Sequence, residues 1–126
     1  MSSIYSIFNK HLGEFIDDIL ILFPNNPDIM MAKKGIEFIK NGNPKLILQY
    51  WVTHISAKYA QQIEDQDISF FINNDYTSDV KTASDSTSII QAIDKLRQPI
   101  RDMNVSDQQK CMQYISNLTK LSNMAT

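Results

Sequence analysis

The sequence is poor in cysteine, glycine and long apolar runs. Cys111 is its only cysteine, so no internal disulfide can form, and zinc sites with several thiolates and C-x-x-C redox centres are excluded. The glycines, Gly13, Gly35 and Gly42, stand far apart and cannot build a glycine-rich phosphate loop. The longest apolar run, residues 19–23, is far shorter than the ~20 residues of a membrane-spanning helix. The sequence therefore predicts no membrane span.

A surplus of one charge is also missing, and so is a targeting signal. Twelve Lys and Arg stand against fourteen Asp and Glu, for a formal net charge of −2, which gives little field to attract a phosphate backbone. The first residues contain no basic segment followed by an apolar one, so we expect no secretion signal. These absences favour an intracellular protein in a reducing compartment, with nucleic acid as an unfavoured partner.

Apolar residues at helical spacing are abundant. The 126 residues are 43% hydrophobic, enough for one core, and we expect a single helical domain over 1–126. Side chains that recur every three or four residues predict five helices, plus a short helical piece in an acidic segment. The five helices cover about 3–23, 27–41, 44–59, 86–100 and 106–122, and the short piece covers 68–72. The short connections predict a compact all-α fold, an antiparallel or orthogonal bundle.

Capping residues and prolines set the predicted boundaries. The Asn-Pro pairs at 26–27 and 43–44 are typical helix starts. Ser106, three residues before Gln109, predicts a capping box at the start of the last helix. Pro99 is expected to kink or end the helix that contains it, because proline removes a backbone donor.

Two segments are expected to lie outside the packed helices. Residues 77–88 are rich in Ser, Thr and Asp and predict an exposed loop. The tail, 123–126, is expected to fray. Trp51, by contrast, lies beside the apolar stripe of the third helix and is predicted to anchor the core.

The polar residues do not suggest a reaction centre. His11, Glu14 and Asp18 lie on adjacent turns of one predicted helix, at spacings that could hold a metal ion. A solvated helix face is the simpler interpretation, because such sites usually take ligands from several elements. His54 has no nucleophile beside it, and Cys111 on an apolar stripe is typical of a buried thiol. We expect no enzyme activity, cofactor or metal; a metal-dependent enzyme built on the first three residues is an alternative.

Two charged clusters are the candidate contact residues. One is a group of lysines in and after the second helix, which could meet phosphate or an acidic partner but is also ordinary for a solvated helix. The other belongs to the segment 64–79, which contains acidic and no basic residues. The candidates are Lys33, Lys34, Lys40, Lys45, Glu64, Asp65, Asp67 and Asp75. The methionines, among them Met30 and Met31, could add an adaptable apolar surface.

Three stretches of the sequence carry a resemblance to viral proteins. They are Phe8-Asn9-x-x-Leu12-x-Glu14-Phe15-Ile16-Asp17-Asp18, then Phe23-Pro24 with Asp28, and Phe70-Phe71-x-Asn73-x-Asp75-Tyr76. In these stretches the chain resembles small uncharacterised helical proteins of nucleocytoplasmic large DNA viruses, including the giant viruses of algae and amoebae. The resemblance implies a protein located in the host cytoplasm, in the viral factory, or in the virion. It brings no active site.

Together, the absence of a reaction centre and this resemblance suggest an interaction protein. We expect a non-enzymatic protein that binds other proteins, as a small virion or minor capsid-associated component of a large DNA virus. Its partners would be capsid or other virion proteins, and an oligomer is compatible with the sequence. The alternative is a binding module that acts on host protein or viral nucleic acid during infection, with the lysines as its contact.

Overall fold

The elements of the structure are all helical in the part that is described. The computed structural model describes residues 3–73 and 84–125. Its elements are α1 (Ile4–Leu22), α2 (Pro27–Gly42), α3 (Leu46–Trp51), the π-helical turn η1 (Val52–Ser56), α4 (Ala60–Glu64), α5 (Ser69–Asn73), α6 (Ser84–Arg101) and α7 (Val105–Met124). These residues contain no strand, which confirms the predicted all-α class.

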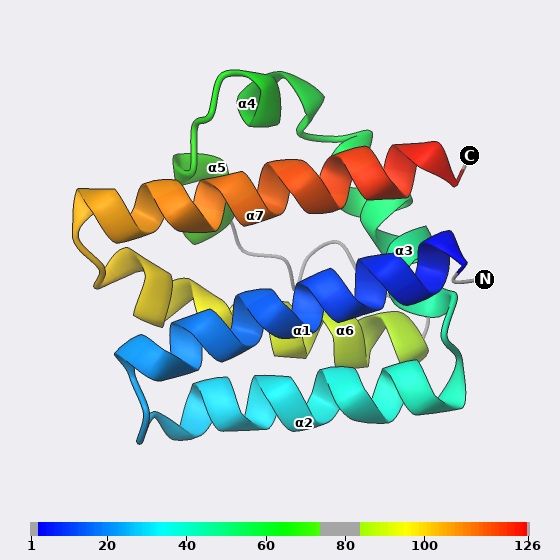
Figure 1. Ribbon diagram of the computed structural model, residues 1–126, viewed down its shortest axis with the longest axis horizontal. Helices are drawn as coiled ribbons and strands as arrows, with labels where there is room; N and C mark the ends of the chain where they lie inside the picture. The colour runs from blue at the N-terminus through cyan, green and yellow to red at the C-terminus, as the bar shows by residue number, and fades with distance from the viewer. Residues whose placement is uncertain (1–2, 74–83, 126) are drawn as a thin grey trace.

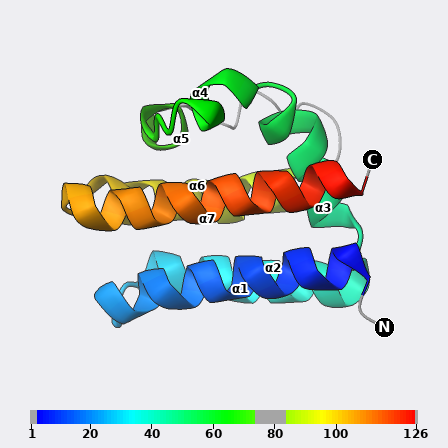
Figure 2. The same cartoon turned by 45° about the horizontal axis from the view of Figure 1, so that its top comes forward.

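The four long helices form an up-and-down bundle (Figure 1). α1 packs against α2 and α7, and α6 packs against α2 and α7, with each neighbour running in the opposite direction. Figure 2 shows α1 and α2 in one layer and α6 with α7 in the next, while α4 and α5 lie on the far side of α7. The short helix α3 contacts α1, α2 and α7 at one end of the bundle. None of the described helices combines the length and apolar character that crossing a membrane requires.

Trp51 confirms its predicted role as a core anchor. It is 2% exposed, and its indole Nε1 donates a hydrogen bond of 3.0 Å to Thr119 Oγ1 on α7. Trp51 and Phe8 pack edge to face, with ring centroids 5.7 Å apart. Nearby, Asn9 Nδ2 donates to the Pro44 carbonyl at 2.8 Å, which ties α1 to the α2–α3 connection. Other fully buried large side chains include Phe15, Ile16, Ile19, Ile29, Ile47, Leu48, Ile55 and Phe71.

The predicted helix over 44–59 is wrong in its extent, because the structure divides it. α3 begins only at Leu46, since Asn43 Oδ1 accepts from the Lys45 backbone N–H at 3.1 Å and holds a turn there. After Trp51 the backbone widens into η1, where the Ala57 N–H donates to the Val52 carbonyl, five residues back. The described residues hold seven α-helices and η1, where five helices and a short helical piece were predicted.

The helix α4 was not predicted, and an unusual residue ends it. Gln66 has a φ of 58°, in the left-handed region that glycine usually occupies at a helix end. This conformation lets the Asp67 N–H donate to the Gln62 carbonyl at 2.9 Å. Gln66 Nε2 also donates to Ser116 Oγ on α7 at 2.8 Å. Gln66 therefore combines a side-chain hydrogen bond to α7 with a backbone conformation that glycine would adopt more easily.

Three predicted boundaries of the last two helices are wrong. α6 begins at Ser84 and continues beyond Pro99 to Arg101, so Pro99 lies in the last turn, and the helix loses the hydrogen bond that a backbone N–H at this position would donate to an earlier carbonyl. The loop predicted at 77–88 is therefore helical from 84 onward, and 77–83 lie outside the described residues. α7 runs to Met124, beyond its predicted end at residue 122, and fraying of the tail stays a prediction.

The cap of α7 also differs from the prediction. Asn104 Oδ1 accepts from the Asp107 N–H at 2.8 Å, so Asn104 is the capping residue and Ser106 lies inside the helix. Gln108, rather than Gln109, reaches back, and its Nε2 donates to the Ile100 carbonyl at 3.1 Å. Both candidate caps are good N-terminal residues, and the geometry of the α6–α7 turn selects the earlier one.

Replacing Gly13 with alanine is expected to stabilise the protein. No heavy atom lies within 4 Å of the position that a Cβ would take at Gly13, so alanine would gain about 1 kcal/mol from helix propensity without a clash. At Gly35 a Cβ would make an ordinary contact, 3.8 Å from Ala92 Cβ, and we expect a similar gain. Urea denaturation of both variants measures the change, and a lower unfolding free energy for Gly13→Ala would contradict it.

Candidate functional site

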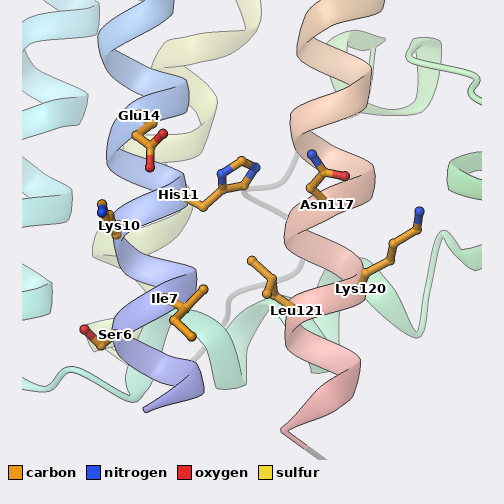
Figure 3. Close-up of a pocket in the computed structure, with 8 residues that line it drawn as sticks. All are labelled: Ser6, Ile7, Lys10, His11, Glu14, Asn117, Lys120 and Leu121. Atoms are coloured by element: carbon orange, nitrogen blue, oxygen red, sulfur yellow. The ribbon is translucent and has the colours of Figure 1, made fainter. Parts of the chain in front are cut away.

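A groove of about 530 Å³ lies between α1 and α7. Figure 3 shows Ile7 and Leu121 facing each other across it, with Lys10 and Glu14 on the α1 side and Lys120 on the α7 side. The full lining is Ser6, Ile7, Lys10, His11, Glu14, Asn117, Lys120 and Leu121. An apolar floor between charged margins is the form of a protein contact surface.

An aromatic ridge closes this groove. The His11 ring lies 4.9 Å from the Tyr114 ring, and Tyr114 stacks on Phe15 with centroids 5.0 Å apart. The Tyr114 hydroxyl donates a hydrogen bond to Asp18 Oδ2. This bond, with a smaller contribution from burial, raises the pKa of Tyr114 to about 12. Tyr114 is therefore a protonated donor at neutral pH and not a base.

Beyond the ridge a second hollow of about 280 Å³ continues between the same two helices. It is lined by Phe15, Asp18, Ile19, Ile21, Leu22, Met103, Asp107, Lys110, Cys111 and Tyr114. The two hollows share the α1–α7 contact and lie on either side of the His11–Tyr114 pair. They form one long surface along both helices.

Two of the three residues considered for metal binding, His11 and Asp18, contact Tyr114 in this ridge. His11 stacks on Tyr114, and Asp18 accepts the Tyr114 hydrogen bond, so two of the three are engaged with an aromatic ring. Glu14 lies on the groove margin. Across residues 3–73 and 84–125, no three His, Cys, Asp or Glu side chains are close enough to share a metal ion.

The second histidine and the cysteine lie in separate environments. The His54 ring lies on η1, 4.5 Å from the Tyr50 ring. Cys111 is buried, and its thiol contacts Met103 Sδ at 3.5 Å. The lining of the hollow around Cys111 contains no histidine. The structure thus places Cys111 as a buried apolar side chain, as its spacing predicts.

The thiol of Cys111 is expected to react slowly in the folded protein. Burial, with the Asp107 and Asp18 carboxylates adding to it, raises the pKa of Cys111 to about 12. At pH 8 the thiolate fraction should therefore be about a thousandfold lower than in the unfolded chain, where the pKa is near 8.5. Labelling with a disulfide reagent, with and without urea, measures the ratio. A ratio below tenfold would contradict the prediction.

The same shift gives a direction for stability at high pH. The folded-state pKa of Cys111 exceeds its unfolded value, so the folded protein binds this proton more tightly. The resulting stabilisation is complete below about pH 8.5 and is lost as the pH rises toward the folded pKa. A Cys111→Ala variant should lose less stability than the original chain over that alkaline range.

Two of the predicted lysines have partners within the fold. Lys33 Nζ lies 2.9 Å from Asp17 Oδ1 and joins α2 to α1, and the hydrogen bond with Asp17 raises the pKa of Lys33. Lys45 Nζ lies 5.5 Å from the centre of the Tyr5 ring. Two of the four predicted lysines thus contact side chains of α1.

The predicted acidic residues are used partly for capping. Asp67 Oδ1 accepts from the Ser69 N–H at 3.0 Å and from its hydroxyl, at the start of α5, and these bonds lower the pKa of Asp67. Glu64 and Asp65 are exposed at the end of α4. Asp75 lies outside the described residues. The described acidic residues lie at and after the end of α4 and before α5, and they do not enclose a site.

An exposed apolar surface on α2 includes Met31, which was named as a possible apolar contact, and Phe38, which was not predicted. Phe38 is 82% exposed, and Met31, two helical turns earlier, is also exposed. Lys34 is exposed at the spacing that places it between them on the same side of the helix. We name these three residues the α2 outer face. The buried stripe of α2, Ile29, Ala32, Ile36 and Ile39, omits residue 38, and this omission was the available signal.

Comparison with known proteins returns no match for this chain. No family model, no curated protein and no solved structure matches the chain. Support for a function therefore comes from the side chains and surfaces described above and from the resemblance within the sequence.

Proposed function

We propose that this chain is a non-enzymatic protein-interaction module. The observation that carries the proposal is Phe38, which is 82% exposed on the α2 outer face. Single exposed apolar residues are common, but an aromatic ring aligned with Met31 on an exposed helix side has the composition of an interface centre. Binding would remove this ring from water, with a gain of about 1.5–3 kcal/mol for full burial.

The use of polar residues within the fold supports the same proposal. Asp18, Asp67 and Lys33 each bond a neighbouring element, and these contacts hold helices and caps together. A reaction needs polar groups that converge on a substrate. These three side chains instead have structural roles, and those roles explain their positions.

The chemistry of the partner follows from the side chains around Phe38. Lys34 lies between the two apolar residues, and Lys40 lies in the last turn of the same helix. A complementary partner would offer an apolar pocket bordered by carboxylates, because opposite charges at a rim favour association. On the sequence resemblance, we further propose that this partner is a capsid or other virion protein of a large DNA virus. The chain would then act in the infected host cytoplasm or in the particle.

Photocrosslinking from the α2 outer face tests the proposal. A photoreactive phenylalanine analogue at position 38 should crosslink one viral protein in infected cells, and the chain should be detected in purified particles. The matched control places the analogue at Ala60, which is exposed on α4, and should not give that product. Equal crosslinking from both positions would contradict the α2 outer face. Particles that lack the chain would contradict the virion assignment.

A further inference from the structure

We propose that a second copy of this chain binds along the surface between α1 and α7, around a twofold axis. We call this surface the α1–α7 face; it comprises the groove, the ridge and the second hollow described above. It lies on other helices than Phe38, so the proposal goes beyond the docking of a viral partner on α2.

Exposed apolar side chains run along this face. Ile21 is 74% exposed, and Leu22 beside it and Ile7 at the opposite end of α1 are exposed as well. All three line the two hollows. On α7, Leu121 is half-buried and faces Ile7 across the groove (Figure 3). A partner that covers both hollows would bury apolar side chains at each end of the face.

The charges on the face are arranged so that the face complements itself. The groove carries Lys10 and Lys120, with Glu14 as its acidic residue. The second hollow carries the opposite balance: its acidic residues are Asp18 and Asp107, and its lysine is Lys110. One end of the face is thus more basic and the other more acidic.

A twofold axis brings these unlike ends together. In an isologous interface the same patch on both subunits meets itself, so that one end of each patch faces the other end of its partner. With the axis near the His11–Tyr114 pair, the basic end of one copy would lie against the acidic end of the other. This contact would occur twice. The arrangement identifies the occupant as a second copy, because the complementary surface is the face itself.

The size of the face supports a weak dimer. α1 has 19 residues, which span ~28 Å, and two adjacent helices are ~20 Å wide. The projected area of ~560 Å² per copy lies near the lower end of specific interfaces. We expect a dissociation constant of about 1–100 µM.

A charge-swap experiment tests the proposal. Analytical ultracentrifugation at low salt should show a reversible dimer of the original chain. The double variants Lys10→Glu/Lys120→Glu and Asp18→Lys/Asp107→Lys should each dimerise at least tenfold more weakly, because like charges then meet at both contacts. An equimolar mixture of the two variants should restore the dimer, since each altered end again faces its opposite.

Three results would overturn the proposal. They are a monomeric original chain at 500 µM, unchanged dimerisation of either double variant, and no recovery in the mixture of two folded variants. The matched control Lys34→Glu/Lys40→Glu makes the same charge change on α2 and should leave the dimer unchanged. Ile21→Lys alters an exposed side chain and places a lysine against the basic end of the other copy, so it should fold and still weaken the dimer at least tenfold. With the photoreactive analogue moved to the exposed Met31, Phe38→Asp should abolish partner crosslinking without affecting the dimer, which separates the two proposals.

Discussion

Replacing Trp51 with alanine is expected to lower the free energy of unfolding by about 3–5 kcal/mol, the range measured for aromatic residues removed from cores. The indole is 2% exposed, packs on Phe8 and donates to Thr119 Oγ1, so alanine would leave a cavity where α1, α3 and α7 meet. A protein of this size has about 5–15 kcal/mol in total. Urea denaturation followed by far-UV circular dichroism measures the loss.

Two milder variants separate packing from hydrogen bonding at this position. Trp51→Phe keeps an aromatic ring against Phe8 and should lose less stability than the alanine variant. Thr119→Val leaves the Trp51 N–H without its partner, at a cost of about 1–3 kcal/mol. If Trp51→Ala unfolded at the same urea concentration as the original chain, the placement of Trp51 in the core would be wrong.

Replacing Phe15 with alanine is expected to have an effect of similar size, about 3–5 kcal/mol. Phe15 is 1% exposed and lies beneath Tyr114 in the aromatic ridge. The loss of its ring removes core contacts and the support for Tyr114, which holds α7 to Asp18 of α1. Thermal or urea denaturation measures the stability change.

The same substitution at Phe38 is a matched control, because both residues lie on long helices of the bundle. Phe38 is exposed, and its replacement by alanine should change the unfolding free energy by no more than about 0.5 kcal/mol. Equal losses at the two positions would show that Phe38 packs within the fold. That result would also remove the observation on which the proposed function depends.

The long helices could be predicted because one rule determines them. Phe8, Phe15 and Ile19 recur at the spacing of one helix face, and the structure buries all three. The same spacing identified the buried sides of α2 and α7, and on α6 it identified Leu96 and Ile100 as buried. A regular stripe of apolar residues needs only one side of a helix to face the core, whatever element supplies the opposite surface.

The middle of the chain could not be predicted in the same way. The widened turn at Val52–Ser56 contains no glycine or proline to mark it, and Gln66 adopts a conformation that sequence rules assign to glycine. Asn104 and Ser106 are two residues apart and are both good caps. At each of these places packing against α7, or the geometry of a turn, decides between local alternatives.

Residue types alone could predict only part of the candidate site. Lysines can be counted in a sequence, but whether Lys33 meets Asp17 depends on how α1 and α2 pack. The two hollows depend on the pairing of α1 with α7, which are far apart in the chain. The exposure of Phe38 could have been predicted, because residue 38 lies outside the buried apolar stripe of α2.

The π-helical turn holds one residue more than a regular helix would hold over the same rotation. Because a π turn contains one more residue than a turn of α-helix, the extra residue is taken up within the turn, and the chain leaves it in nearly the phase of a regular helix. Deleting the exposed Thr53 is therefore expected to convert Val52–Ser56 into regular helix and to leave α4 packed against α7. A one-residue deletion in the middle of α1, which contains no such turn, should instead rotate the residues that follow by ~100° and carry their apolar stripe away from the core.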